Sequence, residues 1–336
     1  MNLKFKKPSK ETQMAMSKVA SGEDSLDYTS LAEEKLTGIT NHDYAKLVSS
    51  GNAAILAVMN AINGPILIPE EGGWSGFKQF AHFLNKDLKL VKTNHGLIEL
   101  EHLEEIIHSP FLRGSLDLSD ENNHSALFLT SFAGYTAEQD IKEISKYLHD
   151  HNILLVEDAS GSITDSEGKL ANGVYSDIII GSTGSPKIVN VESGGFITAN
   201  DNSLFQRSSL LLKTVKASNI NACGINAELD YANDTLNKTI EATMYLKEKI
   251  ESETNFEVFH SDKRGINVII KTDDPKSLSY QLRQEFRLDS HGMVTKCPNY
   301  NRLKTKAVAL EIKNLDISCL DSTNLDSIVE TLKRFD

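Results

Sequence analysis

The chain has 336 residues, of which 40% are hydrophobic and 24% charged, and its formal net charge at pH 7 is −12. These values suit a globular protein with one large domain and a smaller one, and they exclude the clustered basic surface that a nucleic-acid partner requires. The acidic residues are spread along the chain, and we expect the short basic start, Lys4-Phe5-Lys6-Lys7, to be a solvated terminus.

The cysteine content and the N-terminal sequence bear on the cellular compartment of the protein. The three cysteines, Cys223, Cys297 and Cys319, are too few and too widely spaced for a disulfide framework or a zinc site, which fits a reducing compartment. The first residues lack the apolar region of a signal peptide, and no apolar run approaches the roughly 20 residues that cross a bilayer. His149 and His151 fit solvated positions better than ligand positions. We therefore expect a soluble, cytoplasmic protein without membrane, nucleic-acid or metal partners.

Helical patterns and short apolar runs alternate from about residue 28 to residue 200. The alternation is typical of βαβ crossovers, so it predicts a mostly parallel sheet covered by helices on both faces, a three-layer α/β/α arrangement. In chain order, we expect a helix at 30–36, a helix from 49 to 62, strands at 65–69 and 88–93, a helix at 100–109, a strand at 126–132, a helix at 137–151, and strands at 153–160, 176–182 and 194–200.

The pattern changes after residue 204. We expect a helix at 225–252, a strand at 267–272, a helix at 277–286, a strand at 307–313 and a terminal helix at 323–335. This is a small α+β layer of roughly a hundred residues, within the usual size of a domain. The prediction is an N-terminal arm and large α/β domain in residues 1–235, followed by a small α+β C-terminal domain in residues 236–336.

Polar residues stand where the predicted strands end. Asp158 ends one strand and Ser182 ends a later one. Lys187 follows Ser182 by five residues, and a glycine pair, Gly194-Gly195, opens the next strand. Singly, each has an ordinary explanation as a cap, a surface charge or a turn. Because the carboxyl ends of parallel strands line the ligand crevice of such a sheet, their order favours one shared site.

These residue types are the parts that pyridoxal 5′-phosphate (PLP) chemistry requires. A lysine such as Lys187 forms a Schiff base and moves a proton, and a carboxylate such as Asp158 keeps the pyridine nitrogen protonated. The phosphate needs N–H groups at a helix N-terminus, which Gly51 and Asn52 would supply, together with a hydroxyl donor such as Ser182. Trp74, the one tryptophan, follows a strand in a glycine-rich loop. It fits either stacking on the cofactor ring or ordinary packing.

Seven motifs between Leu31 and Leu229 occur in order: LAEEKLTG, AKLVSSGNAAI, ILIPEEGGWSGF, LLVEDAS, EGKLANGVYSDIIIGSTGSPK, the glycine pair and CGINAELDYA. Together they resemble the DegT/StrS-type PLP-dependent sugar aminotransferases, a branch of the fold-type I, or aspartate aminotransferase, superfamily. The resemblance implies a fold-type I large domain, with Lys187 as Schiff-base lysine and proton shuttle and Asp158 opposite the pyridine nitrogen. It also implies Ser182 at the phosphate, Trp74 on the ring, and Asn226 at a phosphate of the neighbouring subunit, hence a homodimer.

The chain departs from this family at three points. Gly161 stands where the family usually places Gln or His near the cofactor's phenolic oxygen, and Ser160 or Ser162 could substitute for that side chain. Ala227-Glu228 stands where the arginine of a G-x-N-x-R segment would come. The C-terminal third lacks the family's substrate segment, which leaves three candidates for holding a substrate carboxylate or phosphate: Arg264, His291 and Arg302.

The resemblance implies an aminotransferase that moves an amino group from an amino acid donor to a keto acceptor, with a keto-sugar as one candidate. A lysine at position 187 argues against the family's dehydratase branch, which carries histidine there. Two alternatives stay open. One is another fold-type I reaction, by a lyase, an aminoacyl-group transferase, or a desulfurase with a mobile cysteine such as Cys297. The other is a PLP-fold binding protein without turnover.

Overall fold

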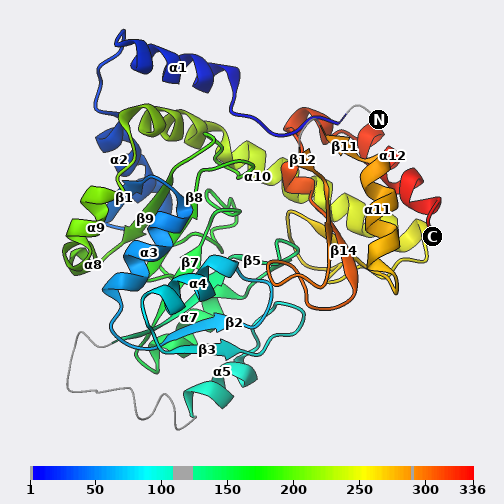
Figure 1. Ribbon diagram of the computed structural model, residues 1–336, viewed down its shortest axis with the longest axis horizontal. Helices are drawn as coiled ribbons and strands as arrows, with labels where there is room; N and C mark the ends of the chain where they lie inside the picture. Colours follow the sequence, from blue (N-terminus) through cyan, green and yellow to red (C-terminus); the bar gives the residue numbers. More distant parts are fainter. Residues whose placement is uncertain (1–2, 109–123, 289–290) are drawn as a thin grey trace.

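A mostly parallel, seven-stranded sheet forms the centre of the larger part of the molecule (Figure 1). The computed structural model describes residues 3–108, 124–288 and 291–336. The strand order is β1-β9-β8-β7-β4-β2-β3, and β9 alone runs against its two neighbours, which confirms the predicted sheet. The strands are β1 (Tyr44–Val48), β2 (Ile66–Pro69), β3 (Leu88–Val91), β4 (Ser125–Thr130), β7 (Ile153–Asp158), β8 (Ile178–Ser182) and β9 (Gly195–Ala199).

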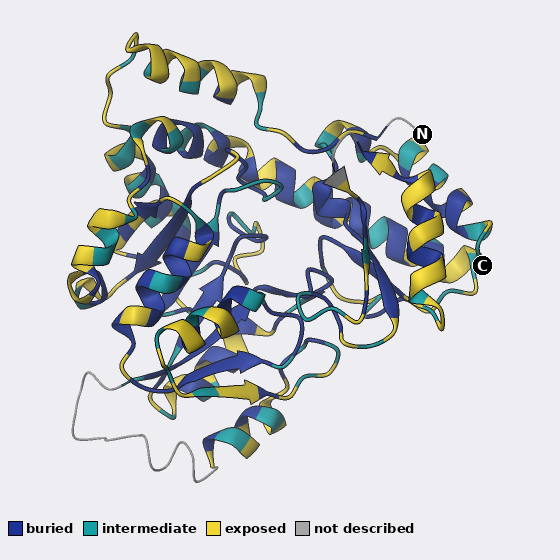
Figure 2. Cartoon of the chain, in the orientation of Figure 1, coloured by how far each residue is buried: buried dark blue, intermediate teal, exposed yellow. Residues whose placement is uncertain are grey.

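Helices cover both faces of this sheet, as the three-layer prediction requires. The first face packs against α3 (Gly51–Ala61), α4 (Ser75–Phe83), α8 (Asn202–Arg207) and α9 (Ser209–Thr214). The second face packs against α2 (Tyr28–Thr40), α5 (Leu100–Ile107), α7 (Ile141–His149) and the first half of the long helix α10 (Asn219–Glu253). In Figure 2 the strands between these helices are buried, whereas the outward faces of the helices are exposed.

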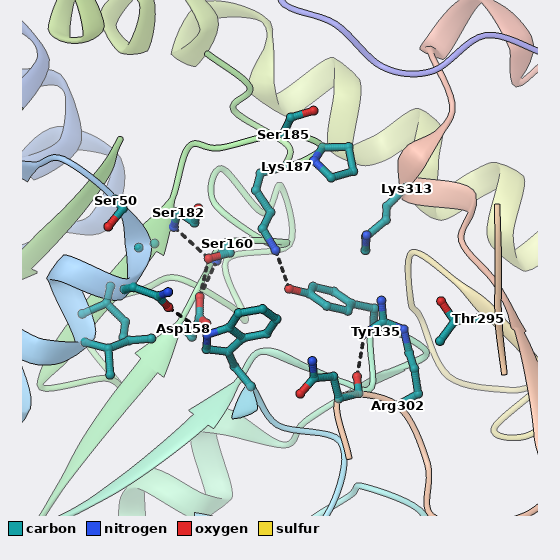
Figure 3. A pocket seen from close by; sticks show the side chains of 18 of the residues that line it. Ser50, Tyr135, Asp158, Ser160, Ser182, Ser185, Lys187, Thr295, Arg302 and Lys313 are labelled. Atoms are coloured by element: carbon teal, nitrogen blue, oxygen red, sulfur yellow. Dashed lines mark hydrogen bonds between the residues drawn. The ribbon is translucent and has the colours of Figure 1, made fainter. Parts of the chain in front are cut away.

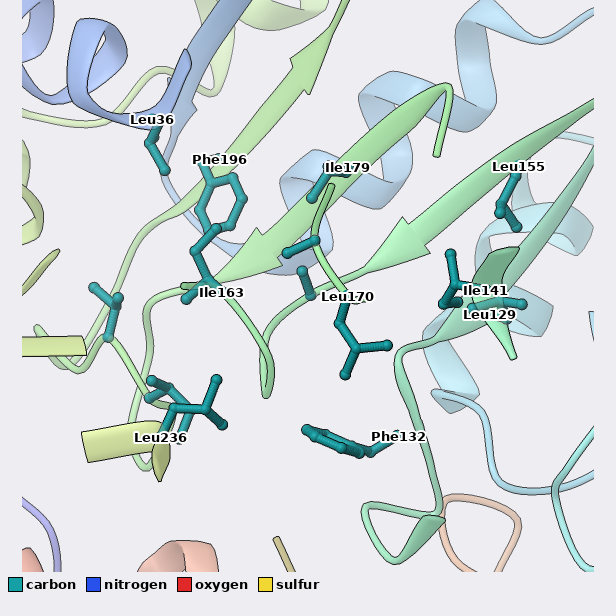
Figure 4. Packing of buried hydrophobic residues seen from close by; sticks show 14 of the residues in the cluster. Leu36, Leu129, Phe132, Ile141, Leu155, Ile163, Leu170, Ile179, Phe196 and Leu236 are labelled. Atoms are coloured by element: carbon teal, nitrogen blue, oxygen red, sulfur yellow. The ribbon is translucent and has the colours of Figure 1, made fainter. Parts of the chain in front are cut away.

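The strands bury side chains toward both helical layers. In β4, Leu127 and Leu129 join the cluster beneath α2, α5, α7 and α10, whereas Ala126 and Phe128 join the cluster beneath α3 and α4. Successive side chains of a strand point to opposite faces, so a strand covered on both sides must be apolar throughout. This is why uninterrupted apolar runs predicted the strands. Figure 4 shows part of the cluster that contains Leu129, in which side chains of helices and strands pack together.

The smaller C-terminal part has its own core. Its three-stranded antiparallel sheet has the order β10-β14-β13. Leu246 and Ile250 of α10 pack with residues of this sheet and of the last helix. The elements are β10 (Val268–Lys271), α11 (Pro275–Glu285), β11 (Arg287–Leu288), β12 (His291–Gly292), β13 (Val294–Lys296), β14 (Ala307–Leu310), the 3₁₀ helices η1 (Ile312–Asn314) and η2 (Ile317–Cys319), and α12 (Ser322–Lys333). The division at 235/236 stays a prediction, since α10 runs through it without interruption.

The first residues of the chain cross to this C-terminal part. Leu3 and Phe5 lie in its core, and Phe5 pairs with Leu315 through a β-bridge. Lys6 is buried as well, and its backbone N–H donates to the Asn314 carbonyl at 2.8 Å. The expectation of a solvated terminus is therefore wrong for Phe5 and Lys6, because Phe5 is drawn into an apolar core and carries its neighbour with it.

Three further elements complete the described chain. Helix α1 (Lys10–Ser21) packs against α10 on the outside of the molecule, and β5 (Phe132–Ala133) pairs with β6 (Ala137–Glu138). Neither α1 nor the edge strand β1 was predicted, since α1 is largely exposed and β1 is short with an interrupted burial pattern. None of the helices in the described ranges combines the length and the apolar character needed to cross a bilayer.

Lys247 of α10 ties the two parts together. Its side chain is fully buried, and its Nζ donates to the carbonyl oxygens of Thr136, His260 and Lys263, each at 2.7 Å. Burial lowers the pKa of Lys247 to about 8. The three N–H groups of the ammonium thus have three partners, and the loop that carries Thr136 is fixed to the C-terminal part.

Replacing Lys247 with methionine should destabilise the fold by roughly 3 kcal/mol, because the three carbonyls lose charge-assisted hydrogen bonds while the apolar stem is kept. Urea unfolding followed by circular dichroism measures the change. Lys249→Met is the matched control on the same helix, since Lys249 forms an exposed ion pair with Glu253 and should contribute less than about 1 kcal/mol. Equal midpoints for the two variants would contradict the role given to Lys247.

Candidate functional site

A cavity of about 460 Å³ lies at the carboxyl ends of β7 and β8 (Figure 3). Six of the seven residues predicted for cofactor binding line it: Gly51, Asn52, Trp74, Asp158, Ser182 and Lys187. The seventh, Asn226, is not among its lining residues; it lies in α10, where its backbone carbonyl accepts a hydrogen bond from Lys35 at 2.8 Å. The predicted role of Asn226 at a neighbouring subunit stays a prediction.

One end of the cavity is built to hold an anion. Helix α3 begins there, capped by Ser50, whose Oγ accepts a hydrogen bond from the backbone N–H of Ala53 at 3.0 Å. The first N–H groups of a helix have no helical partner, and the helix dipole favours negative charge beside them. Ser182 adds a hydroxyl, because its Oγ accepts from the Gly184 N–H at 3.2 Å and keeps its own hydrogen to donate. These donors fit a phosphate group.

Gly51 allows this end of the cavity to form. A Cβ atom at Gly51 would lie 2.5 Å from the Cβ of Ser182, so any other residue would push α3 away from β8. The glycine therefore brings the free N–H groups of the helix next to the serine hydroxyl.

Asp158 is buried at the end of β7 and forms no ion pair with a described basic side chain. Ser160 Oγ donates to its Oδ1 and also accepts from the backbone N–H of Ser182 at 2.8 Å, which links the two strand ends. Burial raises the pKa of Asp158, although Ser160 and Lys187 act in the opposite direction. Both hydrogen bonds of the carboxylate with described residues use Oδ1, so Oδ2 is left for a ligand. A protonated pyridine nitrogen would satisfy this oxygen and stabilise the ionised acid.

Lys187 reaches into the cavity from the loop after β8. Its Nζ donates to the hydroxyl oxygen of Tyr135 at 2.8 Å and lies 5.9 Å from the centre of the Trp74 ring. Burial lowers the pKa of Lys187, but the Tyr135 oxygen and the Asp158 carboxylate outweigh it, and the net shift is upward. Tyr135 thus orients the amine at the centre of the cavity (Figure 3).

The packing around Tyr135 explains why position 161 is a glycine. A Cβ atom at Gly161 would lie 2.9 Å from Ile266 Cδ1 and 3.2 Å from Tyr135 Cε1, so Ile266 and the tyrosine ring together leave no room for a side chain at 161. Of the two serines proposed as substitutes, Ser160 lines the cavity but is bound to Asp158. Ser162 is fully buried and donates to Ser131 Oγ at 2.6 Å. The sequence interpretation missed Tyr135, which lies between β5 and β6, five residues after the end of β4.

The backbone of Tyr135 is held in an unusual conformation. Its φ is +66°, in the left-handed region that costs energy for an aromatic residue. Its carbonyl accepts from the N–H groups of both Ile266 and Asn267 at 2.9 Å, and the neighbouring Thr136 carbonyl binds Lys247. Strain of this kind persists where the surroundings fix it, and it is frequent at functional sites.

The C-terminal part supplies the opposite wall through Thr295, Asn299, Asn301, Arg302 and Lys313. The loop after β13 is fastened to the large part. Tyr300 Oη donates to the Pro69 carbonyl at 2.9 Å, and Asn301 Oδ1 accepts from the Ser75 N–H, at the start of α4, at 2.9 Å. These two hydrogen bonds hold the wall against the large part, so both parts of the chain line one cavity.

The three residues predicted to bind a substrate anion lie in different surroundings. Arg302 lies at the cavity, but its Nε and Nη2 donate to the two oxygens of Glu311 at 2.8 and 2.7 Å. Arg264 does not line the cavity; it is paired with Glu138 and Asp165. The backbone of His291 lies in β12, and its side chain lies outside the described residues.

The proposed reactive cysteine is not placed for chemistry. Cys297 is fully buried, and burial raises the pKa of its thiol, which keeps it protonated. Cys223 and Cys319 are buried too. A desulfurase mechanism needs a mobile cysteine beside the cofactor, and the geometry of Cys297 disfavours that alternative.

Two family models match the chain. The model of the DegT/DnrJ/EryC1/StrS aminotransferase family matches residues 10–266, and that of the MJ1341 family C-terminal domain matches residues 233–333. A search of curated proteins gives no match.

Solved structures with the same fold have low sequence identity. The chain is similar to Helicobacter pylori PseC, an aminotransferase involved in the biosynthesis of pseudoaminic acid (TM-score 0.75, 13% identity, 99% of each chain covered). It is also similar to a Brucella abortus DegT DnrJ EryC1 StrS aminotransferase (TM-score 0.73, 13% identity, 96% of this chain and 95% of that chain). A third is Sphingomonas wittichii serine palmitoyltransferase (TM-score 0.74, 12% identity, 97% and 83%). These likenesses show the fold. The family model matches most of the length of the chain. The chain therefore belongs to the DegT/DnrJ/EryC1/StrS aminotransferase family, whose cofactor is PLP.

Proposed function

We propose that this PLP-dependent aminotransferase holds its cofactor in the cavity at the ends of β7 and β8, bound through Lys187, and passes the amino group of an amino acid to a keto substrate. The observation that carries the proposal is the placement of Lys187, Asp158 and Ser182 around one cavity. When bound, PLP supplies an electron sink that weakens the bonds at the substrate's Cα.

Each part of the cofactor has a fitting group in the cavity. The N–H groups of Gly51 and Asn52 and the hydroxyl of Ser182 would hold its phosphate. The free Oδ2 of Asp158 would accept from its pyridine nitrogen, and Trp74 would lie against its ring. Asn52 Oδ1 accepts from the Trp74 indole N–H at 3.0 Å, which fixes the indole beside the cavity.

Proton transfer is assigned to Lys187 with Tyr135 beside it. An amine that carries a proton between two substrate atoms must be held in position, and it needs a hydrogen-bond partner that can give or take a proton. The Tyr135 hydroxyl, 2.8 Å from Lys187 Nζ, meets both needs. It also fits the role that Gln or His fills at position 161 in the family.

The proposed acceptor is a keto-sugar. Family membership supports it, and two proteins of the same fold are PseC, involved in the biosynthesis of pseudoaminic acid, and DesI, whose crystal structure contains its TDP-sugar product. A lyase, an aminoacyl-group transferase and a silent binding protein have no observation in their favour within the described residues.

The purified protein should show a cofactor absorption band in or near the visible, and Lys187→Ala should lose it together with roughly 10³-fold or more of the turnover. Borohydride reduction and peptide mass spectrometry should find the cofactor on the peptide that carries Lys187. Lys169→Ala is the matched control, since Lys169 is an exposed lysine paired with Glu167. Absence of a band after PLP addition would contradict the proposal, and a band that no amino acid changes would favour the silent binding protein.

Tyr135→Phe removes only the hydroxyl, so the cofactor should still bind while turnover falls roughly tenfold for the lost hydrogen bond. The Tyr135 oxygen raises the pKa of Lys187, so its removal lowers that pKa and should shift the rate of PLP attachment to the cofactor-free protein toward lower pH. Stopped-flow absorbance across a pH series measures the shift. Tyr300→Phe, which removes a hydroxyl bonded to Pro69 in the neighbouring loop, should leave the pH profile in place.

The homodimer belongs to the proposal as well. If Asn226 reaches the cofactor phosphate of a partner subunit, Asn226→Ala should weaken PLP binding while the protein stays dimeric in sedimentation velocity. Asn233→Ala, farther along the same helix, is the control, because Asn233 Nδ2 donates to the Thr164 carbonyl of its own chain at 2.8 Å. A monodisperse wild-type monomer that turns over would rule out this arrangement.

A further inference from the structure

Lys313 lies in the same cavity as Lys187, on the wall from the C-terminal part. It belongs to η1, three residues after Leu310, the last residue of β14, and its side chain is buried. Its Nζ is 5.1 Å from the centre of the Tyr135 ring, and Lys187 Nζ is 5.0 Å from the same centre. The two amines therefore flank one aromatic ring at the centre of the site (Figure 3).

The hydrogen bonds of Lys313 leave part of its ammonium free. Nζ donates to Asn314 Oδ1 at 2.8 Å and lies 3.4 Å from Glu311 Oε2. An ammonium has three N–H groups, and the described residues offer no partner for the third. Because Lys313 lines the cavity, this donor is available to a ligand there.

Arg302 differs from Lys313 because a carboxylate already matches its charge. Its Nε and Nη2 engage both oxygens of Glu311, and Nη1 donates to the Asn301 carbonyl at 2.6 Å. Asn267 Nδ2 also donates to Glu311 Oε2, at 2.7 Å. Three of the five N–H groups of Arg302 have partners, and the charges of Arg302 and Glu311 cancel as a one-to-one pair.

The charges on this wall do not balance. One carboxylate, Glu311, faces two cations, Arg302 and Lys313, and Lys187 stands across the Tyr135 ring. Burial lowers the pKa of Lys313 to about 7, with Arg302 and Lys187 acting in the same direction against Glu311. A buried cation without its own counterion is costly, and an anion at this point would remove the cost.

We propose that Lys313 binds a carboxylate of the substrate and so places the amino-acid donor next to Lys187. The inference rests on the proposed function, since it names the chemistry that the same site recognises. A single excess positive charge suits a carboxylate, whereas a phosphate monoester carries close to two negative charges at pH 7 and suits a site such as the start of α3. In an amino acid the carboxylate is bonded to the reacting Cα, so anchoring it fixes that carbon near Lys187.

A purely structural role for Lys313 makes the opposite prediction for stability. If Lys313 served to neutralise Glu311, its loss would destabilise the fold. Arg302 already neutralises Glu311 through two hydrogen bonds, so Lys313→Met should leave the unfolding midpoint unchanged or raise it. A clearly lower midpoint would assign Lys313 to the stability of the C-terminal part and overturn the proposal.

The binding test uses two amines that differ in one group. 2-Methylalanine carries a carboxylate and no hydrogen on Cα, and isopropylamine lacks the carboxylate. Each is titrated into the PLP-loaded protein while the cofactor absorption band is followed. The wild type should prefer 2-methylalanine by roughly tenfold or more, the value of one charge-assisted hydrogen bond. Lys313→Met and Lys313→Gln should lose the preference with isopropylamine binding unchanged, and Lys313→Arg should restore much of it.

The outcomes separate the two proposals. A wild type without a cofactor band would refute the proposed function. A band that persists in Lys313→Met together with an intact preference for 2-methylalanine would overturn the role of Lys313 alone. Inorganic phosphate that competes more strongly than acetate in the wild type, and no longer in Lys313→Met, would overturn the carboxylate assignment in favour of a phosphate-bearing substrate.

Discussion

The close approach of helix α3 to strand β8 is the contact on which the site depends. At Gly51 there is no room for a side chain against Ser182, and a Cβ at Gly195 would lie 2.6 Å from the Gly181 carbonyl and 2.8 Å from the Gly51 nitrogen. This tight junction sets the free N–H groups of α3 beside the ends of β7 and β8. Asp158 and Ser182 then share one cavity because their strands are parallel neighbours.

The part of the site that could be predicted from the sequence is the part that follows directly from strand ends. Strands covered on both faces are apolar throughout, so the polar residue where each one stops is conspicuous, as Asp158 and Ser182 are. Lys187 lies five residues beyond Ser182, and its loop is short enough to keep it at the same edge of the sheet. The family likeness then assigned roles to these positions, while the alternation of strands with helices predicted the mostly parallel sheet.

The remainder depends on contacts between distant segments. Tyr135 also follows a strand end, but only the packed structure shows that its ring lies beside Gly161, together with Ile266. Arg302 reaches the cavity because Tyr300 and Asn301 fasten its loop to Pro69 and Ser75, more than 200 residues earlier. Lys313 reaches the cavity from η1, beyond strand β14. No local pattern marks such contacts. The same holds for Lys6, which is buried through the pairing of Phe5 with Leu315.

Two buried lysines show how a structural charge differs from one kept for a ligand. Lys247 has three carbonyl partners at 2.7 Å, so its ammonium is satisfied by the fold alone. Lys313 has one close partner, a second at 3.4 Å and a counterion that is already bound to Arg302. A buried ammonium whose N–H groups lack partners does not stabilise the fold. Such groups are frequent at sites where a protein binds a ligand. The incomplete shell of Lys313 is therefore best explained by a substrate that completes it.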